Sequence, residues 1–340
     1  MQCPVYPISK RVHRVFAQFV SSMVLVSAVA FSALPSLAAE PSKLSLQKET
    51  DRITVLLAGR PLTTLHFGAK WDKPFLHPLR SSSGVVISRG FPLDPQPGDS
   101  KDHAWHRGIW YGHGDVNGED FWRELGPEKS GRLAPVQAPE ALIRNGAAVL
   151  KLSLSMLGRL PEKKRYGTIG EQYTIRVDGP LVFIDAVITV TADAGMDLRF
   201  GDSDDGGFGF RLSEAYREDR GAQLRNSEGG IGSKAIWGKS AKWVDYSALI
   251  EGKTIGLAAL DHPSNVRYPE AWHARGYALC AANPFALGSF AEDKTIDGSY
   301  TVKAGDTLTL HYRVVIHEGK ATHETLDRWQ SEFAATKELR

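Results

Sequence analysis

The chain has 340 residues, with 41 Lys and Arg against 39 Asp and Glu, and two cysteines. This near-neutral balance provides no strongly basic surface, so we expect neither nucleic acid nor an anionic membrane as a partner. One cysteine lies near the N-terminus, which leaves Cys280 without an internal disulfide partner, and its apolar neighbours predict a small buried residue.

The N-terminus has the pattern of a secretory signal peptide. Basic residues precede an apolar run at 19–34, and small residues follow it. A retained membrane anchor is the alternative, but the run is shorter than the roughly 20 residues that a spanning helix needs. We therefore expect residues 1–39 to be a signal peptide and the mature chain, 40–340, to be periplasmic or secreted, with no membrane association after cleavage.

Strand patterns dominate the mature chain. Residues 52–67 form two alternating runs that meet at Ala58-Gly59, and residues 171–192 predict a hairpin with its turn at 178–180. Frequent glycine and proline residues separate the runs, as many short strands require. Further strands are predicted from alternating or apolar runs at 147–157, 254–260, 298–302 and 306–317.

One convincing helix is predicted, at the C-terminus. Thr322 is a plausible N-cap, and Leu326, Trp329 and Phe333 share one face at spacings of three and four residues. Many strands without crossover helices indicate an all-β protein with antiparallel sheets. We expect a single large antiparallel β-sandwich domain at 40–340 with a short C-terminal helix. The pattern does not indicate an oligomeric state.

The stretch "DHAWHRGIWYGHGDVNGEDFW", residues 102–122, concentrates histidines, tryptophans and acids. Residues three apart face opposite sides of a strand, so His103 and His106 can converge only on a turn or a helix; the preceding Pro- and Gly-containing run favours a loop. The next residues look extended, so that His113 and Asp115 share one strand face. We predict that His103, His106, His113 and Asp115 are acid–base residues.

Two kinds of site remain open for these residues. His103, His106 and His113 could ligate a divalent metal, although their spacing differs from the known metal motifs. They could equally transfer protons, because histidine ionises near neutral pH. For any one of them, a hydrogen-bonded structural role is the plain alternative.

Aromatic and polar residues in three stretches suggest a sugar-binding surface. Aromatic faces stack on the C–H faces of sugars, and polar side chains bond their hydroxyls; the alternative for the tryptophans is an aromatic core. A Pro-rich polar loop at 261–285 follows a predicted strand, a place where function often resides. The predicted substrate-binding residues are Arg107, Trp110, Asn117, Trp122, Arg211, Asn265, Trp272, His273 and Arg275.

Several blocks in order resemble a bacterial family labelled "methane oxygenase PmoA". The resemblance covers about 75–319, through "FLHPLRSSSGVVISRGFP", "GDSDDGGFGFR", "WGKSAKWVDYSA", "HYRVVIHEG", the stretch 102–122 and the loop 261–285. It implies a β-sandwich and, because members often lie beside sugar dehydrogenases and isomerases, a carbohydrate role, but no catalytic residues. Mutarotase-like supersandwiches are a looser likeness. The oxygenase label finds no support in these residues, since the mature chain has no spanning segment.

Serine-hydrolase, nucleotide-binding, zincin and dinucleotide motifs are all missing from the sequence. We predict an exported enzyme that acts on a sugar or oxidised (keto) sugar glycoside by His and carboxylate acid–base chemistry, with or without a divalent metal, as a hydrolase, lyase or epimerase. The alternatives are a non-catalytic carbohydrate-binding protein and a metal-dependent redox protein. The deciding observation is whether 102–122 and 261–285 line one surface.

Overall fold

A computed structural model describes residues 44–336. The predicted signal peptide, 1–39, lies outside these residues. No helix within the described range is both long and apolar enough to span a membrane. The described residues, 44–336, group as one compact unit.

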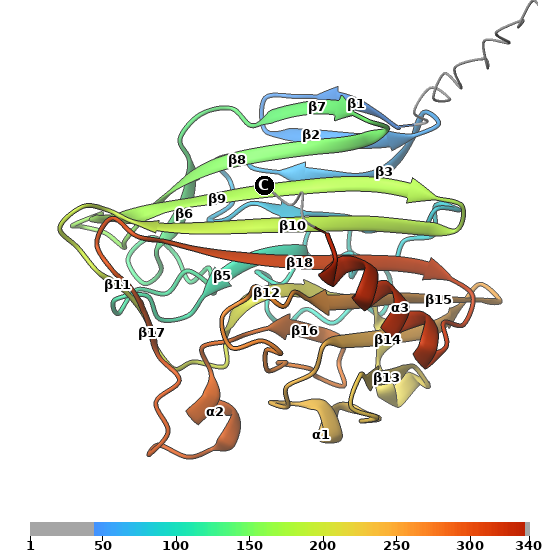
Figure 1. The fold of residues 1–340 in the computed structure, drawn as a ribbon. Helices are drawn as coiled ribbons and strands as arrows, with labels where there is room; N and C mark the ends of the chain where they lie inside the picture. The colour runs from blue at the N-terminus through green and yellow to red at the C-terminus, as the bar shows by residue number, and fades with distance from the viewer. Residues whose placement is uncertain (1–43, 337–340) are drawn as a thin grey trace, which may run out of the picture. The chain divides into compact units, whose positions relative to one another are not determined.

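The prediction of an all-β fold with antiparallel sheets is confirmed (Figure 1). One sheet has seven strands, in the order β1 (Leu44–Lys48), β2 (Arg52–Leu57), β3 (Arg60–His66), β4 (Phe75–Leu76), β5 (Gly108–His113), β12 (Gly206–Arg211) and β16 (Leu279–Ala282). We call it the seven-stranded sheet. Strand β12 joins segments that are far apart in the sequence, because it pairs with β5 on one side and with β16 on the other.

The second large sheet has nine strands, and its long central strands lie side by side in Figure 1. Its order is β13 (Gln223–Asn226), β14 (Trp243–Ile250), β15 (Lys253–Asp261), β18 (Thr307–Glu318), β10 (Leu181–Ala192), β9 (Arg165–Asp178), β8 (Ala147–Leu157) and β6 (Arg132–Pro135), with β7 (Glu140–Arg144) also paired to β8. A small sheet joins β11 (Leu198–Phe200) to β17 (Tyr300–Val302).

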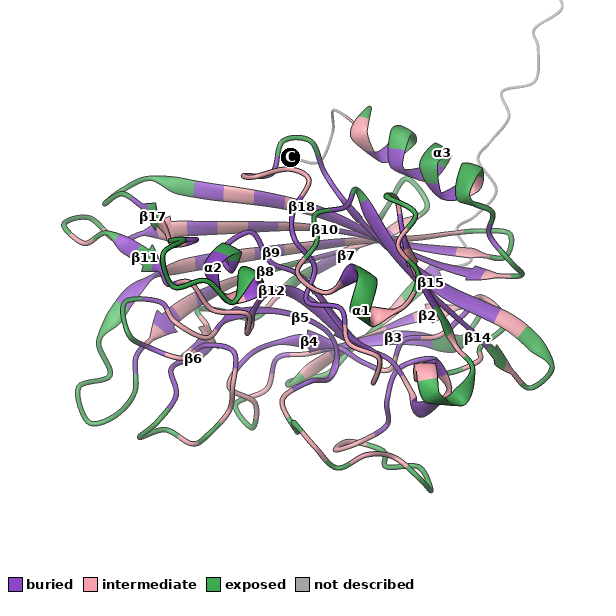
Figure 2. Ribbon diagram, turned by 90° about the horizontal axis from the view of Figure 1, so that it is seen from below, coloured by how far each residue is buried: buried purple, intermediate pink, exposed green. Residues whose placement is uncertain are grey.

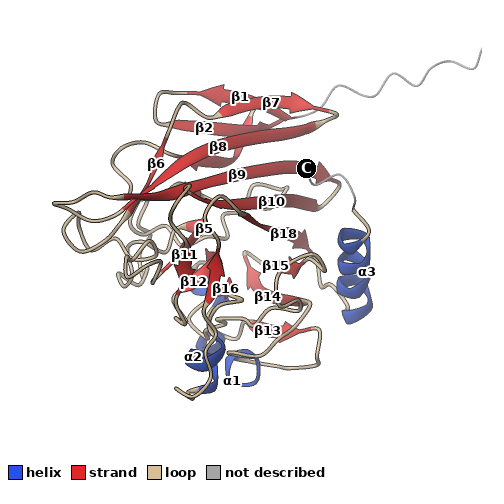
Figure 3. Ribbon diagram, turned by 60° about the vertical axis from the view of Figure 1, so that its left-hand side comes forward, coloured by secondary structure: helices blue, strands red, loops and turns tan. Residues whose placement is uncertain are grey.

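Few helices accompany the sheets in the described chain (Figure 3). They are α1 (Ser233–Ile236), α2 (Leu287–Ala291), α3 (His323–Ala334) and two 3₁₀ turns, Glu214–Tyr216 and Glu218–Arg220. The predicted C-terminal helix is confirmed as α3, where the Thr322 hydroxyl accepts a hydrogen bond from the Thr325 N–H at 3.1 Å. The predicted apolar face of α3 packs on strands β10, β14, β15 and β18.

Buried residues alternate with more exposed ones along β8 and β9 of the nine-stranded sheet (Figure 2), and alternate side chains of both large sheets pack the interior. The predicted hairpin is confirmed as β9–β10, where Asp178 pairs with Leu181 and Gly179 has a φ of +53°. Glycine tolerates this left-handed conformation without steric cost, so the two-residue turn fixes the register of the pair. The strands continue beyond the predicted hairpin, since β9 begins at Arg165.

An acidic side chain interrupts this apolar interior. Strand alternation turns Glu171 inward between Ile169 and Tyr173, and its side chain is buried. One carboxyl oxygen accepts a hydrogen bond from the Tyr173 hydroxyl at 3.0 Å, whereas Oε1 has no hydrogen-bond partner among the described residues. Burial raises the pKa of Glu171 from 4.5 to about 8, so the folded protein holds this carboxyl protonated at neutral pH.

Glu171 is therefore expected to make the fold less stable as the pH rises. Between pH 4.5 and about 8 the unfolded chain loses this proton and the folded chain keeps it. This difference lowers the free energy of unfolding by about 1.4 kcal/mol per pH unit. Urea titrations from pH 5 to 8 should show that Glu171→Gln reduces the dependence of the free energy of unfolding on pH by about 1.4 kcal/mol per pH unit, the contribution of one proton. The exposed Glu140→Gln variant is the matched control, and an unchanged slope in Glu171→Gln contradicts the assignment.

Candidate functional site

Strand β5 divides the stretch 102–122 between the two faces of the seven-stranded sheet. Ile109 and Tyr111 point into the sandwich and belong to its main core. Trp110 points to the other side, which we call the outer face, and packs there with Trp122 and Phe75. The predicted alternation along this strand is thus present, and the tryptophans line the outer face.

The outer face accommodates two indoles because β12 carries a glycine beneath them. A Cβ atom at Gly209 would lie 2.9 Å from ring atoms of both Trp110 and Trp122. Contacts this close do not occur between real side chains, so the glycine permits both rings to pack on the sheet. A platform of buried aromatic rings results, and the loop carrying His103 and His106 lies on it.

Asp102 and His103 form a pair at the surface of this platform. The His103 Nδ1 lies 2.5 Å from Asp102 Oδ2, and the imidazole is 43% exposed. Because Nδ1–H donates to the carboxylate, Nε2 is the basic nitrogen, and it has no hydrogen-bond partner among residues 44–336. His103 also has a φ of +42°, a strained backbone conformation of the kind that clusters at functional sites. We call this pair the Asp102–His103 dyad.

Two buried arginines hold the carboxylate of the dyad. Arg89 Nη1 donates to Asp102 Oδ1 at 2.8 Å, and Arg211 Nη2 donates to the same oxygen at 3.1 Å. Partial burial alone would raise the pKa of Asp102, but the hydrogen bond from His103 and the charge of Arg211 lower it by more. The carboxylate therefore stays ionised at neutral pH and keeps the imidazole in one orientation.

Aromatic stacking links the dyad to a distant part of the chain. The His106 ring lies between His103 and Trp110, with centroid distances of 4.9 and 5.1 Å. Tyr277 stacks on His103 at 6.3 Å and lies over the Arg211 guanidinium, 4.5 Å from the ring centroid. The stretch 102–122 and the loop 261–285 therefore meet at one surface, which is the convergence that the sequence left open.

His106 has a supporting position in this stack. Its side chain is buried, and its Nε2 accepts a hydrogen bond from Trp122 Nε1 at 3.1 Å. Burial, assisted by the charge of Arg211, lowers the pKa of His106 well below its usual range. The neutral ring braces His103 and does not contact solvent, so the structure places only one of the two loop histidines within reach of a ligand.

His113 and Asp115 lie away from the dyad. His113 points into the interior, where its Nε2 lies 2.8 Å from the Gly201 carbonyl and its ring packs against Phe285. Asp115 accepts a hydrogen bond from the Gly118 N–H within a turn. The predicted shared site of His113 with the loop histidines is not formed, because β5 directs His113 to the opposite face of the sheet.

The three predicted metal ligands, His103, His106 and His113, therefore do not converge. Residues 44–336 contain no group of three or more His, Cys, Asp or Glu side chains arranged to hold a metal ion. One ring nitrogen of each histidine instead contacts a carboxylate, an indole N–H or a backbone carbonyl, and the other nitrogens do not point to a common position. These donor sets do not fit a divalent cation.

Of the predicted substrate-binding residues, Arg211 and Arg275 lie near Tyr277, and His273 contacts Arg275; Arg211 and His273 are buried, whereas Arg275 is partly exposed. Arg275 Nε donates to His273 Nε2 at 2.8 Å and Nη2 lies 3.4 Å from the Asp204 carboxylate. Burial raises the pKa of Tyr277, while the charges of Arg211 and Arg275 lower it in part. The positive charges of Arg211 and Arg275 thus both act on the phenol of Tyr277, which stacks on His103 of the dyad.

The other predicted binding residues have structural partners. Trp110, Trp122 and Arg107 are buried beneath the dyad, where Arg107 pairs with Glu124. Trp272 is also buried. Asn117 bonds the backbone of Asp197 and Arg199, and Trp272 bonds the backbone of Ala241. Asn265 bonds the backbone of His311 and the carboxylate of Asp261.

Two residues of the site, Arg89 and Tyr277, were not predicted from the sequence. Arg89 is fully buried and donates hydrogen bonds to the carbonyls of Ser100, Asp102, His103 and His106. It lies in the block "GVVISRGFP", where alternating apolar residues suggest only a strand. Tyr277 lies in an apolar part of the loop 261–285, and only the stacking on His103 identifies it.

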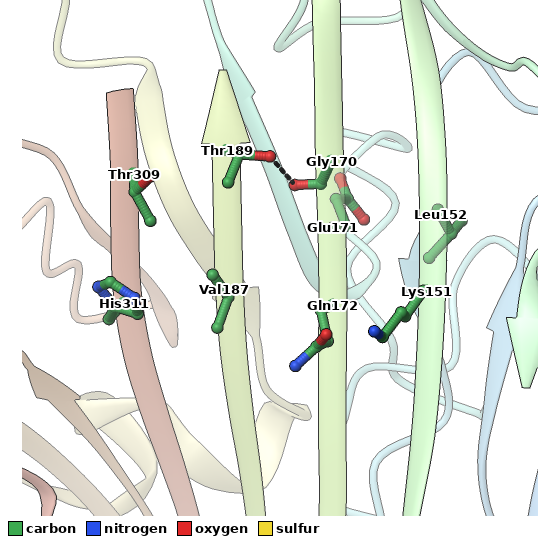
Figure 4. A pocket seen from close by; sticks show the side chains of 9 residues that line it. All are labelled: Lys151, Leu152, Gly170, Glu171, Gln172, Val187, Thr189, Thr309 and His311. Carbon is green, nitrogen blue, oxygen red and sulfur yellow. Dashed lines mark hydrogen bonds between the residues drawn. The ribbon is translucent and has the colours of Figure 1, made fainter. Parts of the chain in front are cut away.

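A separate cavity lies on the nine-stranded sheet. It has a volume of about 510 Å³ and crosses β8, β9, β10 and β18, where the side chains labelled in Figure 4 line it. Its polar side chains are those of Lys151, Glu171, Gln172, Thr189, Thr309 and His311, and the Thr189 hydroxyl bonds the Gly170 carbonyl at 3.5 Å. No tryptophan or tyrosine ring among the described residues lines it, and Glu171 bonds Tyr173 and not His311, so we place the candidate site at the dyad.

Solved structures similar to this chain include sugar enzymes. A galactose mutarotase-related enzyme from Lactobacillus acidophilus is 9% identical, with a TM-score of 0.32 over 81% of this chain and 97% of its own. A galactose mutarotase-like protein from Lactobacillus casei is 7% identical, with a TM-score of 0.33 over 81% and 100%. An α-galactosidase from Geobacillus stearothermophilus is 11% identical, with a TM-score of 0.32 over 86% and 42%.

Likenesses with TM-scores this low carry no argument about activity. No curated protein matches the sequence. One family model does match, over residues 52–330, which is most of the chain, and its description assigns no oxygenase or other activity. The chain therefore belongs to DUF6807, a family of unknown function.

Proposed function

We propose that this protein is an exported enzyme that acts on a sugar or oxidised sugar glycoside by acid–base chemistry, with His103 as the group that exchanges the proton. The observation that supports it is the Asp102–His103 dyad. A carboxylate orients the imidazole, and the basic Nε2 is left free at a half-exposed position. This is the arrangement by which a carboxylate activates a histidine base.

The surroundings of the dyad favour a polar ligand with C–H faces. Trp105 lies edge-on to His103 at 5.4 Å, and Tyr277 is parallel to it. Such rings pack against sugar C–H groups, while charged side chains bond the hydroxyls. The partly exposed Arg275 and the buried Arg211 both act on Tyr277, and their positive charge favours an oxyanion that forms when a proton leaves a carbon beside a keto group.

The roles of the predicted acid–base residues are revised in this proposal. His103 transfers the proton, Asp102 orients it, and His106 supports it from below. His113 and Asp115 contribute to the fold on the other side of β5. The proposal does not include a metal at the three histidines, because β5 directs His113 to the face of the sheet opposite to His103 and His106, so the three side chains do not converge.

Turnover on a panel of glycosides and 3-keto-glycosides tests the proposal. We expect the purified protein to convert at least one keto-glycoside, at the same rate with and without a metal chelator. Sugar binding without conversion of any panel member would favour the non-catalytic alternative. Activity that the chelator abolishes and a divalent metal restores would favour the metal-dependent one.

A further inference from the structure

A second cavity on the outer face of the seven-stranded sheet has no role in the dyad chemistry. It has a volume of about 580 Å³ and is lined by residues of β2 and β3 and by the segment 77–96 that follows β4. Thr54, Thr64, His66, His77 and Arg80 provide polar side chains to its lining. The two threonine hydroxyls lie 3.0 Å apart. The cavity is thus lined by groups that donate and accept hydrogen bonds.

The buried His77 presents a hydrogen-bond donor to this cavity. The Ser88 hydroxyl accepts from the Leu79 N–H at 2.9 Å, which leaves its own proton for His77 Nδ1 at 3.3 Å. Burial, with smaller contributions from the positive charges nearby, lowers the pKa of His77 to about 3, so the ring is neutral. The proton is then on Nε2, which has no hydrogen-bond partner among the described residues although the side chain is 97% buried.

His66 complements His77 with an acceptor. Its Nε2 donates to the His77 carbonyl at 3.0 Å, so Nδ1 carries a lone pair. Its ring stacks on Phe75 with a centroid distance of 4.9 Å, which fixes its orientation. A donor, an acceptor and two hydroxyls on one cavity wall match a ligand that carries several hydroxyl groups.

Besides Arg52, the cavity lining carries two charged side chains, Arg80 and Asp94. The Arg80 guanidinium makes no hydrogen bond or ion pair with any described residue, and Asp94 acts on it only through a longer-range charge interaction, so the donors of Arg80 are free for a ligand. Arg52, also in the lining, is already paired with Glu49 and Asp51. One unpaired guanidinium matches the single charge and two oxygens of a carboxylate, whereas a phosphate dianion would keep an uncompensated charge.

We propose that this cavity binds the acidic sugar unit of a ligand, with Arg80 pairing the carboxylate and His66, His77 and the threonines bonding the hydroxyls. The cavity and the dyad share one support, because Leu93 lines the cavity and packs against the cluster of Phe75, Trp110 and Trp122, on which the dyad loop lies. The sugar class rests on the proposed function, but the site itself is separate from His103.

Calorimetric titration of the purified protein with glucuronate and galacturonate tests this site, with glucose, galactose and inorganic phosphate as comparisons. We expect the uronates to bind, and Arg80→Gln to weaken their binding at least tenfold. Arg80→Lys keeps the charge without the planar fork and should bind with intermediate affinity. Arg60→Gln is the matched control, since Arg60 is exposed on β3 and does not line the cavity.

The result can overturn either proposal separately. Unchanged uronate affinity in Arg80→Gln, equal affinity for glucose, or binding of phosphate in preference to the uronates each rejects the acidic-sugar site. Binding that His103→Ala abolishes and Arg80→Gln keeps places the uronate at the dyad and also rejects it. Uronate binding that depends on Arg80, in a protein that converts no glycoside, supports the cavity and rejects the proposed enzyme.

Discussion

His103→Ala is expected to lower kcat/KM for the best panel substrate by about 10²–10⁴-fold, the usual contribution of a positioned general acid or base. The alanine variant should fold, because the imidazole is 43% exposed and its only side-chain hydrogen bond is to Asp102. The loss should fall on kcat, since the Asp102–His103 dyad is proposed to move a proton and the neighbouring residues to hold the sugar. Steady-state kinetics with circular dichroism of the variant measure both points.

The chain offers a matched control for this experiment. His323 is also about half exposed and also lies beside an aspartate, with Nε2 3.4 Å from Asp327 Oδ2. It lies on α3, against the nine-stranded sheet, so His323→Ala should leave kcat/KM unchanged. Equal activity in His103→Ala and the wild-type protein would reject the dyad as the reacting group.

The secondary structure was largely predictable because it depends on local patterns. Alternation with a period of two and a turn residue that accepts positive φ predict the β9–β10 hairpin, and an N-cap threonine predicts the start of α3. The partners of β5 were not predictable in this way. Its neighbour β12 lies about 100 residues further along the chain, and alternation assigns a side chain to a face without naming the strand beside it.

The same limit explains the errors at the site. Alternation correctly grouped Ile109, Tyr111 and His113, but the outer face of this sheet is itself covered by aromatic rings. Periodicity therefore could not distinguish the face that carries the site from the face that packs in the sandwich. His113 was predicted as an acid–base residue because its type suits that chemistry, whereas its partners are a backbone carbonyl and two phenylalanine rings.

The position of the dyad depends on Arg89, which bonds the Asp102 carboxylate and the His103 carbonyl but not the His103 imidazole. Its side chain is fully buried and donates hydrogen bonds to four backbone carbonyls of the loop 100–106. It also donates to the Asp102 carboxylate. A loop with a positive φ at His103 does not hold this shape by local preference. Arg89 is thus a positioning residue, and it links the stability of the fold to the geometry of the site.

Arg89→Met is therefore expected to reduce the free energy of unfolding by about 3 kcal/mol or more, because the loop carbonyls lose their donor and a buried charge pair is broken. It should also lower kcat, since Asp102 keeps only Arg211 and the imidazole is less well oriented. Urea titration and turnover measure the two effects. Arg328→Met, on the exposed face of α3, should change neither. Full activity in an Arg89→Met protein that is destabilised as expected would show that the loop holds His103 without this arginine.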